Sequence, residues 1–94
     1  MAAFHRSDSG VAHITLSWLE LARYSKNSSP VCDHCLKSLV GYAEITLVPI
    51  LNEALCAKCA EEYLQRARPH PEDANIEAMR VQFYKDYFGL EEAT

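Results

Sequence analysis

The amino-acid sequence predicts a small domain of the α+β class. Two Cys-x-x-Cys pairs are separated by 20 residues, and the segment between them includes a run of β-forming residues from 42 to 48. Apolar residues recur at helical spacing before the first pair and after the second. Apolar types make up 49% of the 94 residues and are spread along most of the chain, which argues against wholesale disorder.

From residue 5 to residue 10 the chain is polar and ends in Gly10, and Phe4 is the one aromatic residue before it, so we expect residues 1 to 10 to form a mobile lead-in. The rest of the chain, residues 11 to 94, has the length of a single domain. At this size the hydrophobic core is modest, and a bound metal ion or a partner often supplies stability that burial does not.

The segment after the lead-in is predicted to be a helix. Its apolar residues share one face at helical spacing, and they are Val11, Ile14, Trp18, Leu21 and Ala22. Two other features of the segment leave alternatives open. Residues 14 to 18 also alternate as a strand would, and Ser17 with Glu20 fits a capping box that would begin a shorter helix. The helix is expected to end at the breaker sequence of residues 25 to 30.

A β-hairpin is predicted between the two cysteine pairs. Residues 42 to 48 are rich in β-formers, and a glycine and a proline bound this run. A turn near Asn52 and a short strand ending at Leu55 would complete the hairpin. A helix should begin immediately afterwards, at Cys56, because apolar residues continue along one of its faces until prolines end it after residue 68.

A C-terminal helix is predicted over residues 71 to 88. Pro71 suits the first helical position, and the two acidic residues after it suit the positive end of the helix dipole. Gly89 fits the left-handed residue just past the helix end, and Leu90 would fold back from there onto the last turn.

The C-terminal helix carries more apolar surface than one core-facing side needs. One stripe at helical spacing is the face expected to pack on the core, and it consists of Ile76, Met79, Phe83 and Tyr87. Val81, Tyr84 and Phe88 extend the apolar arc beyond this stripe, and Arg80 lies within it.

This extra surface predicts a binding face for a protein partner or for a second copy of the chain. Aromatic residues and arginine are the types enriched at interface hot spots. The predicted partner-binding residues are Arg80, Phe83, Tyr84, Tyr87 and Phe88. The alternative is that the first helix covers both flanks with Trp18, Leu19 and Leu21.

The cysteine pattern predicts one zinc ion. Cys32 and Cys35 form the first pair, Cys56 and Cys59 form the second, and the chain has no other cysteine. Zinc prefers four ligands in a tetrahedron, and two intervening residues let a tight turn direct both sulfur atoms at the same ion. Four protein ligands also leave no open position for a substrate or an activated water, so we expect the ion to be structural.

Two disulfides or two redox-active pairs are the alternatives to a metal site. A pair at the beginning of a helix, such as Cys56 and Cys59, occupies the position that acidifies thiols in oxidoreductases. The βαβ pattern that surrounds such redox motifs is missing from this sequence. His34 lies within the first pair and could replace one sulfur, but with four cysteines present we expect it to be a loop residue.

Three features follow one another along the chain: Pro30-Val31-Cys32-Asp33-His34-Cys35, a hairpin, and Leu55-Cys56-Ala57-Lys58-Cys59 entering a helix. Together they resemble a treble-clef zinc finger. LIM-type modules and the C-terminal zinc finger of the DksA/TraR transcription regulators share this general appearance. The resemblance covers residues 30 to 68 and implies the four ligands and the local fold. It implies no particular function, because treble clefs serve many. The long acidic coiled coil of DksA-like proteins has no counterpart in this chain.

The charge balance argues against broad binding to nucleic acid. The formal net charge is −4, and from residue 60 onward there are eight acidic and four basic residues. Binding to DNA or RNA depends on neutralising phosphates with lysine and arginine. The candidate phosphate contacts are Lys58, Arg66 and Arg68.

The sequence predicts a cytoplasmic binding module and no enzyme. No apolar run approaches the roughly 20 residues that cross a bilayer, and the first residues lack the apolar stretch of a secretion signal. No phosphate-cradling glycine loop or nucleophile-and-base arrangement is recognisable. We therefore expect a zinc-stabilised protein-interaction or regulatory module, with a nucleic-acid-binding zinc finger acting in transcription as the alternative.

Overall fold

The computed structural model describes residues 2 to 90 and has the α+β class that the sequence predicts. Residue 1 of the expected lead-in and residues 91 to 94 of the expected domain lie outside the described residues. The elements in chain order are β1 (Ala3–Arg6), β2 (Ala12–Leu16), α1 (Trp18–Ser25), β3 (Ile45–Val48), β4 (Glu53–Leu55), α2 (Ala57–Arg66), a 3₁₀ turn η1 (Pro71–Asp73) and α3 (Ala74–Phe88).

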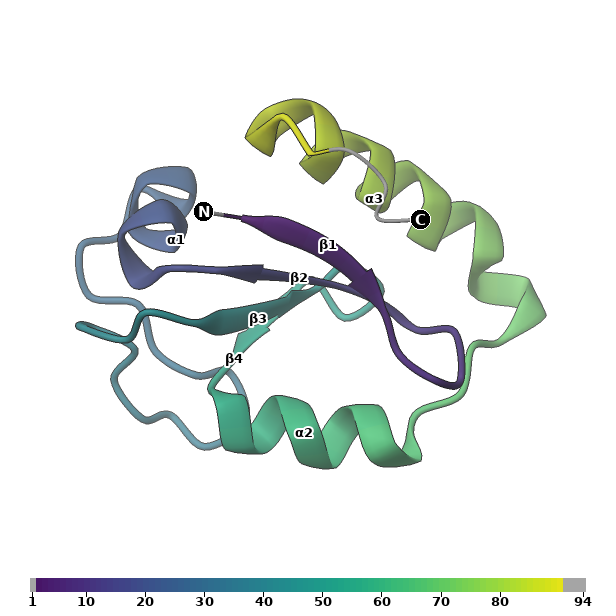
Figure 1. The fold of residues 1–94 in the computed structure, drawn as a ribbon, viewed down its shortest axis with the longest axis horizontal. Helices are drawn as coiled ribbons and strands as arrows, with labels where there is room; N and C mark the ends of the chain where they lie inside the picture. Colours follow the sequence, from purple (N-terminus) through teal and green to yellow (C-terminus); the bar gives the residue numbers. More distant parts are fainter. Residues whose placement is uncertain (1, 91–94) are drawn as a thin grey trace.

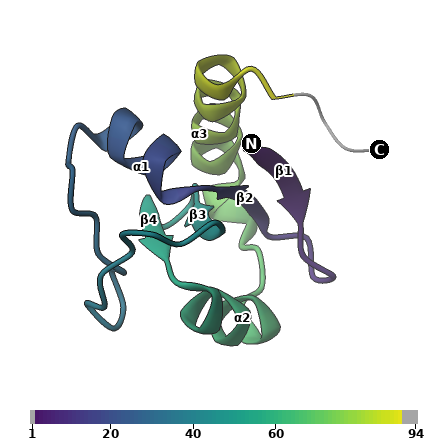
Figure 2. The same cartoon turned by 60° about the vertical axis from the view of Figure 1, so that its left-hand side comes forward.

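The four strands form one antiparallel sheet in the order β1-β2-β3-β4. Figures 1 and 2 show α3 over one face of this sheet and α2 against the opposite face. Because helices cover both faces, every residue of β3 is buried. The largest fully buried side chains come from the sheet and the loops next to it, and they include Ile14, Leu16, Leu39, Ile45, Val48 and Leu55.

The expected mobile lead-in over residues 1 to 10 is wrong for the part that the structure describes. Residues 3 to 6 form β1, which pairs with β2 and places Phe4 opposite Ile14. Phe4 is 3% exposed, and its ring lies between the guanidinium of Arg6 and the ammonium of Lys85. A strand of four residues with a single large apolar side chain has too little periodicity to be found from sequence, since its partner lies in another segment.

The long helix expected from Val11 is also wrong. The shorter helix that the capping box indicates is correct, and the alternative strand is present but lies two residues earlier than residues 14 to 18. Residues 12 to 16 form β2, and a shorter helix, α1, begins at Trp18. The capping box is present as the sequence indicates: Glu20 N–H donates to Ser17 Oγ, and Ser17 N–H donates to a carboxylate oxygen of Glu20. The apolar residues of this segment fit both periods, so the capping box marks where the helix begins.

The predicted hairpin between the cysteine pairs is confirmed as β3 and β4, although β3 begins three residues later than expected. Asn52 turns the chain with a left-handed φ of 55°, and its N–H donates to the carbonyl of Val48 at 2.8 Å. Asparagine is among the residues that tolerate this conformation best.

Helix α3 is rotated relative to the sequence prediction. Val81 and Tyr84 are buried against the sheet, and Phe88 is partly buried. The stripe expected to face the core is exposed instead, at 46% for Ile76, 74% for Met79, 52% for Phe83 and 51% for Tyr87. Both sides of the helix are apolar, so the hydrophobic pattern alone does not decide which side packs inward.

Polar anchors fix the rotation of α3. The guanidinium of Arg80 donates to the carbonyl oxygens of Pro49 and Ile50 at 3.1 and 2.8 Å. The hydroxyl of Tyr84 donates to Asn52 Oδ1 at 2.7 Å, and its ring meets that of Tyr24 on α1 edge to face. These groups bind α3 to the turn between β3 and β4, so turning its outer stripe inward would leave them without partners.

The end of α3 follows the prediction. Gly89 adopts a left-handed φ of 68°, and the N–H of Leu90 donates to the carbonyl of Lys85 at 2.8 Å. This is the hydrogen bond from the second residue past the helix that closes a Schellman motif. Among residues 2 to 90, no helix combines the length and apolarity needed to cross a bilayer.

Burial and a histidine on the neighbouring strand lower the pKa of His13. His5 lies opposite His13, and the two rings stack with centroids 5.4 Å apart. Burial lowers the pKa of His13, a hydrogen bond to the Val11 carbonyl opposes this, and the charge of His5 lowers the pKa further. Because folding weakens proton binding at His13, this group makes the protein less stable as the pH falls below about 6.5.

Replacing His5 with glutamine should raise the pKa of His13, because a neighbouring positive charge is removed. The pKa should stay below about 6.5, since burial persists. An NMR pH titration of the His13 imidazole in both proteins measures the change. An unchanged pKa would contradict an effect of the His5 charge on His13.

Candidate metal centre

The structure brings all four cysteines together. Their sulfur atoms all lie within 4.8 Å of one another, and the sulfurs of Cys35 and Cys56 are 3.9 Å apart. Zinc–sulfur bonds of about 2.3 Å in a tetrahedron place the sulfurs about 3.8 Å from each other. The arrangement therefore fits one metal ion held by four thiolates, as the spacing of the cysteines predicts.

The first pair is held in a tight loop from residue 31 to residue 39. Val31 and Ser38 form a β-bridge across its base, and the N–H of Cys32 donates to the carbonyl of Lys37 at 2.8 Å. The N–H of Leu36 donates back to the carbonyl of Cys32, with Leu36 itself at a left-handed φ of 63°. Such a turn directs both sulfurs of the pair to the same side, which a Cys-x-x-Cys metal site requires.

The second pair is positioned by the beginning of α2. Cys56 is the N-cap residue with extended backbone, and Cys59 lies in the first turn. The first turn of a helix presents free backbone N–H groups and the positive end of the helix dipole. Both effects stabilise negatively charged sulfur at this place.

A set of hydrogen bonds between the first pair and β4 brings the two halves of the site together. The N–H of Asp33 donates to the carbonyl of Ala54 at 2.9 Å, and the N–H of Ala54 donates to the carboxylate of Asp33 at 2.7 Å. His34 Nε2 lies 3.0 Å from a carboxylate oxygen of Glu53. These contacts fix the loop on the outer edge of β4, one residue before the strand reaches Leu55 and then Cys56.

The electrostatics of the thiols favour one negative sulfur even without a metal ion. Burial raises the pKa of the Cys32 thiol, but backbone N–H groups of Cys35, Cys56 and His34 donate to its sulfur and lower the pKa to about 6. A shared hydrogen bond with Cys56 and burial raise the pKa of Cys59 to about 12. A metal ion that binds all four sulfurs must displace the remaining thiol protons, so binding is favoured at higher pH.

Lys37 contributes positive charge beside the site. Its ammonium lies over the ring of Tyr42, 5.0 Å from the centroid. A hydrogen bond with Tyr42 raises the pKa of Lys37, and the charges of Cys56 and Cys35 add to this effect. The lysine therefore stays charged and partly balances an anionic tetrathiolate.

The sequence predicts the roles of two residues next to the cysteines only in part. His34 is a loop residue as expected: its imidazole contacts Glu53 and the ring of Tyr63, and only its backbone N–H donates to a sulfur, that of Cys32. Asp33 was not singled out from the sequence, although a short acidic side chain in a turn often bonds to nearby backbone. Its partner at Ala54 is 21 residues away, so only the fold identifies it.

The five predicted partner-binding residues do not form one surface. Tyr84 is buried, and the guanidinium of Arg80 is bonded to backbone carbonyls within the chain. Phe88 is partly buried, whereas Phe83 and Tyr87 are exposed. Ile76 and Met79, which were expected in the core, are exposed as well, and so is Leu19, which the alternative placed over the C-terminal helix.

The three candidate phosphate contacts also do not lie together on one surface. Lys58 lies in the first turn of α2 and Arg66 in the last, about 12 Å apart along the helix axis. The exposed acidic residues Glu61 and Glu62 lie between them in sequence. The guanidinium of Arg68 donates to the carbonyls of Gln65 and Ala67, so it caps the end of α2.

Comparisons with protein families, curated proteins and solved structures find no match to this chain. The function must therefore be argued from the residues themselves. The chain is a small α+β protein in which four cysteines can hold a metal ion, and zinc is the ion most typical of such a ligand set.

Replacing Asp33 with alanine should lower the free energy of unfolding of the metal-loaded protein by about 1–3 kcal/mol, because the buried N–H of Ala54 loses its acceptor. Asparagine should restore most of this loss, since its amide oxygen can accept the same bond. Denaturant unfolding followed by circular dichroism measures the difference.

Asp8, an exposed acidic residue in the turn between β1 and β2, provides the control. Its replacement with alanine should change stability by less than about 0.5 kcal/mol. Equal effects of the two alanine variants would show that the Asp33 bond does not hold the site together.

Proposed function

We propose that the metal is zinc and that it stabilises the fold. A set of four cysteine ligands selects zinc among the abundant divalent ions, because thiolates are soft ligands and zinc accepts a tetrahedron. The site has no ligand position left for a substrate, so the proposal includes no catalytic step. Thiols that act as ligands need a reducing compartment, and we propose the cytoplasm.

We further propose that residues 30 to 68 are a zinc finger of the treble-clef type. The tight loop around Cys32, the β3–β4 hairpin and α2 with Cys56 at its beginning follow one another in the order of that motif. The flanking strands β1 and β2 and the helices α1 and α3 are additions to it in this chain. This interpretation is supported by element order and ligand position, and it carries no function of its own.

The function that the surface best supports is protein binding through the outer face of α3. The observation that carries it is the exposed stripe, which consists of Ile76, Met79, Phe83 and Tyr87. Contiguous apolar surface on a small protein marks interaction sites more often than chance, and aromatic residues and methionine are enriched there. The bonds of Arg80 and Tyr84 hold this stripe outward, so the helix presents it without rearrangement.

A neighbouring aromatic cluster supports the same proposal. The ring of Tyr24 on α1 contacts Phe83 and Tyr87 with centroids 6.3 and 5.0 Å away. Side chains held against neighbouring rings lose little conformational entropy when a partner binds. Nucleic-acid binding remains a weaker proposal, because its candidate lysine and arginines are separated along α2 and the chain is acidic.

Photocrosslinking from position 83 tests the proposal. A photoreactive phenylalanine analogue at position 83 should crosslink the protein to one defined partner, either another protein or a second copy of the chain. The same analogue at position 61, an exposed site on α2, provides the control and should give no such product.

A second substitution makes the test specific for the stripe. Met79 is 74% exposed, so replacing it with aspartate should leave folding intact and abolish the crosslink from position 83. Equal products from positions 61 and 83, or a crosslink that tolerates aspartate at position 79, would contradict binding through the outer face of α3.

A further inference from the structure

A pocket of about 810 Å³ lies on the side of the protein where α2 ends and α3 begins. The linker between the two helices forms one wall, and the turn between β3 and β4 forms another. Its apolar lining includes Val11, Leu51, Ala67, Pro69 and Ala74. Pockets that bind small molecules have volumes of roughly 300–1,000 Å³ and are mostly apolar with a few polar groups.

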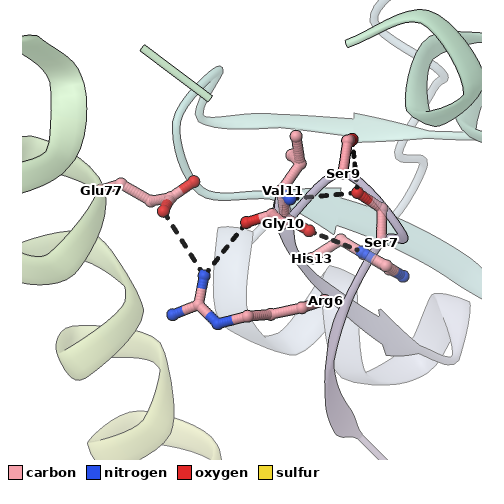
Figure 3. A network of polar contacts seen from close by, with 7 residues as sticks. All are labelled: Arg6, Ser7, Ser9, Gly10, Val11, His13 and Glu77. Carbon is pink, nitrogen blue, oxygen red and sulfur yellow. Dashed lines mark hydrogen bonds and ion pairs between the residues drawn. The ribbon is translucent and has the colours of Figure 1, made fainter. Parts of the chain in front are cut away.

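The walls of this pocket are held in place by hydrogen bonds. The hydroxyl of Ser9 donates to the carbonyl of Ala67 at 2.8 Å, which ties the linker to the β1–β2 turn. Figure 3 shows that turn closing on itself where Val11 N–H meets Ser7 Oγ. In the same view, the guanidinium of Arg6 reaches Glu77 on α3 at 3.6 Å. A pocket with fixed walls needs little ordering when a ligand enters.

Two hydrogen-bond donors on one face of α2 line the pocket. Tyr63 and Arg66 are three residues apart and therefore neighbours on the helix surface. Within residues 2 to 90, the Tyr63 hydroxyl has no hydrogen-bond partner, and the Arg66 guanidinium has neither a hydrogen bond nor an ion pair. Burial and the charges of Glu77 and Glu53 raise the pKa of Tyr63, with Arg66 opposing, so the phenol is a donor at neutral pH.

We propose that this pocket binds a small molecule that has an apolar body and one carboxylate. A carboxylate can accept both N–H groups of an arginine and a hydroxyl proton at the same time. The apolar lining would cover the rest of the molecule. The pocket shares no lining residue with the outer stripe of α3 or with the four cysteines, although the ring of Tyr63 also contacts His34 in the loop of the first pair. The proposal therefore goes beyond the proposed function.

The charges around the pocket select a single negative charge. Asp73 and Glu77 also line it and would repel a doubly charged phosphate more strongly than a carboxylate. Arg6 already compensates Glu77, and the second arginine of the pocket, Arg68, keeps its charge while capping α2. Of the two arginines that line the pocket, Arg68 already donates to backbone carbonyls, so Arg66 is the one whose N–H groups are available to a ligand.

The test is an NMR titration of the metal-loaded 94-residue chain with 4-phenylbutanoate as the probe. Saturable shifts of backbone amides should appear at Val11, Leu51, Ala67 and Ala74. The neutral analogue 4-phenyl-1-butanol should bind about tenfold more weakly, because it lacks the charge-assisted hydrogen bonds. Acetate, which lacks the apolar body, should cause no saturable shift, and 4-phenylbutyl phosphate should bind more weakly than the carboxylate.

Variants assign the carboxylate to Arg66. Replacing Arg66 with glutamine should weaken 4-phenylbutanoate about tenfold and leave 4-phenyl-1-butanol unchanged. Lys58→Gln removes the same charge at the other end of α2 and should affect neither probe. The proposal is overturned by the absence of saturable shifts at the pocket, by equal binding of the acid and the alcohol, by tighter binding of the phosphate, or by equal effects of the two glutamine variants.

Discussion

The fold depends on the meeting of two cysteine pairs that are far apart in the chain. The hydrogen bonds between Asp33 and Ala54 place the loop of the first pair on the edge of β4, immediately before Cys56 and the beginning of α2. Structural zinc contributes on the order of 10–16 kcal/mol in small zinc peptides at neutral pH, whereas a whole domain has a net stability of about 5–15 kcal/mol. A metal ion held by all four cysteines would therefore contribute enough free energy to decide whether residues 30 to 68 fold.

The sheet transmits this local order to the rest of the molecule. The antiparallel pairing of β2 with β3 and of β3 with β4 connects the metal centre to the N-terminal hairpin, and α3 is bonded to the turn between β3 and β4 through Arg80 and Tyr84. The two proposed binding surfaces follow from these contacts. The rotation of α3 exposes Met79 and Phe83, while the junction of α2 with α3 forms the pocket beside Arg66.

The sequence predicted the features that local chemistry determines. The clustering of the four cysteines follows from their spacing, the beginning of α1 follows from the Ser17–Glu20 capping box, and the end of α3 follows from Gly89. It could not predict features that depend on distant segments. Phe4 is buried where β1 pairs with β2 and α3 brings Lys85 over its ring, and the outward stripe of α3 results from bonds between Arg80 and carbonyls about 30 residues earlier. Both apolar sides of α3 have helical periodicity, so a partner elsewhere in the fold had to select one.

Native mass spectrometry of the purified chain, with and without a strong chelator, tests the central claim most directly. The account predicts one zinc ion per chain, and it predicts that chelation removes the ion together with the compact charge-state distribution. A compact chain without metal whose mass is lower by the four thiol hydrogens would instead show two disulfides among Cys32, Cys35, Cys56 and Cys59, and would contradict a zinc-held fold.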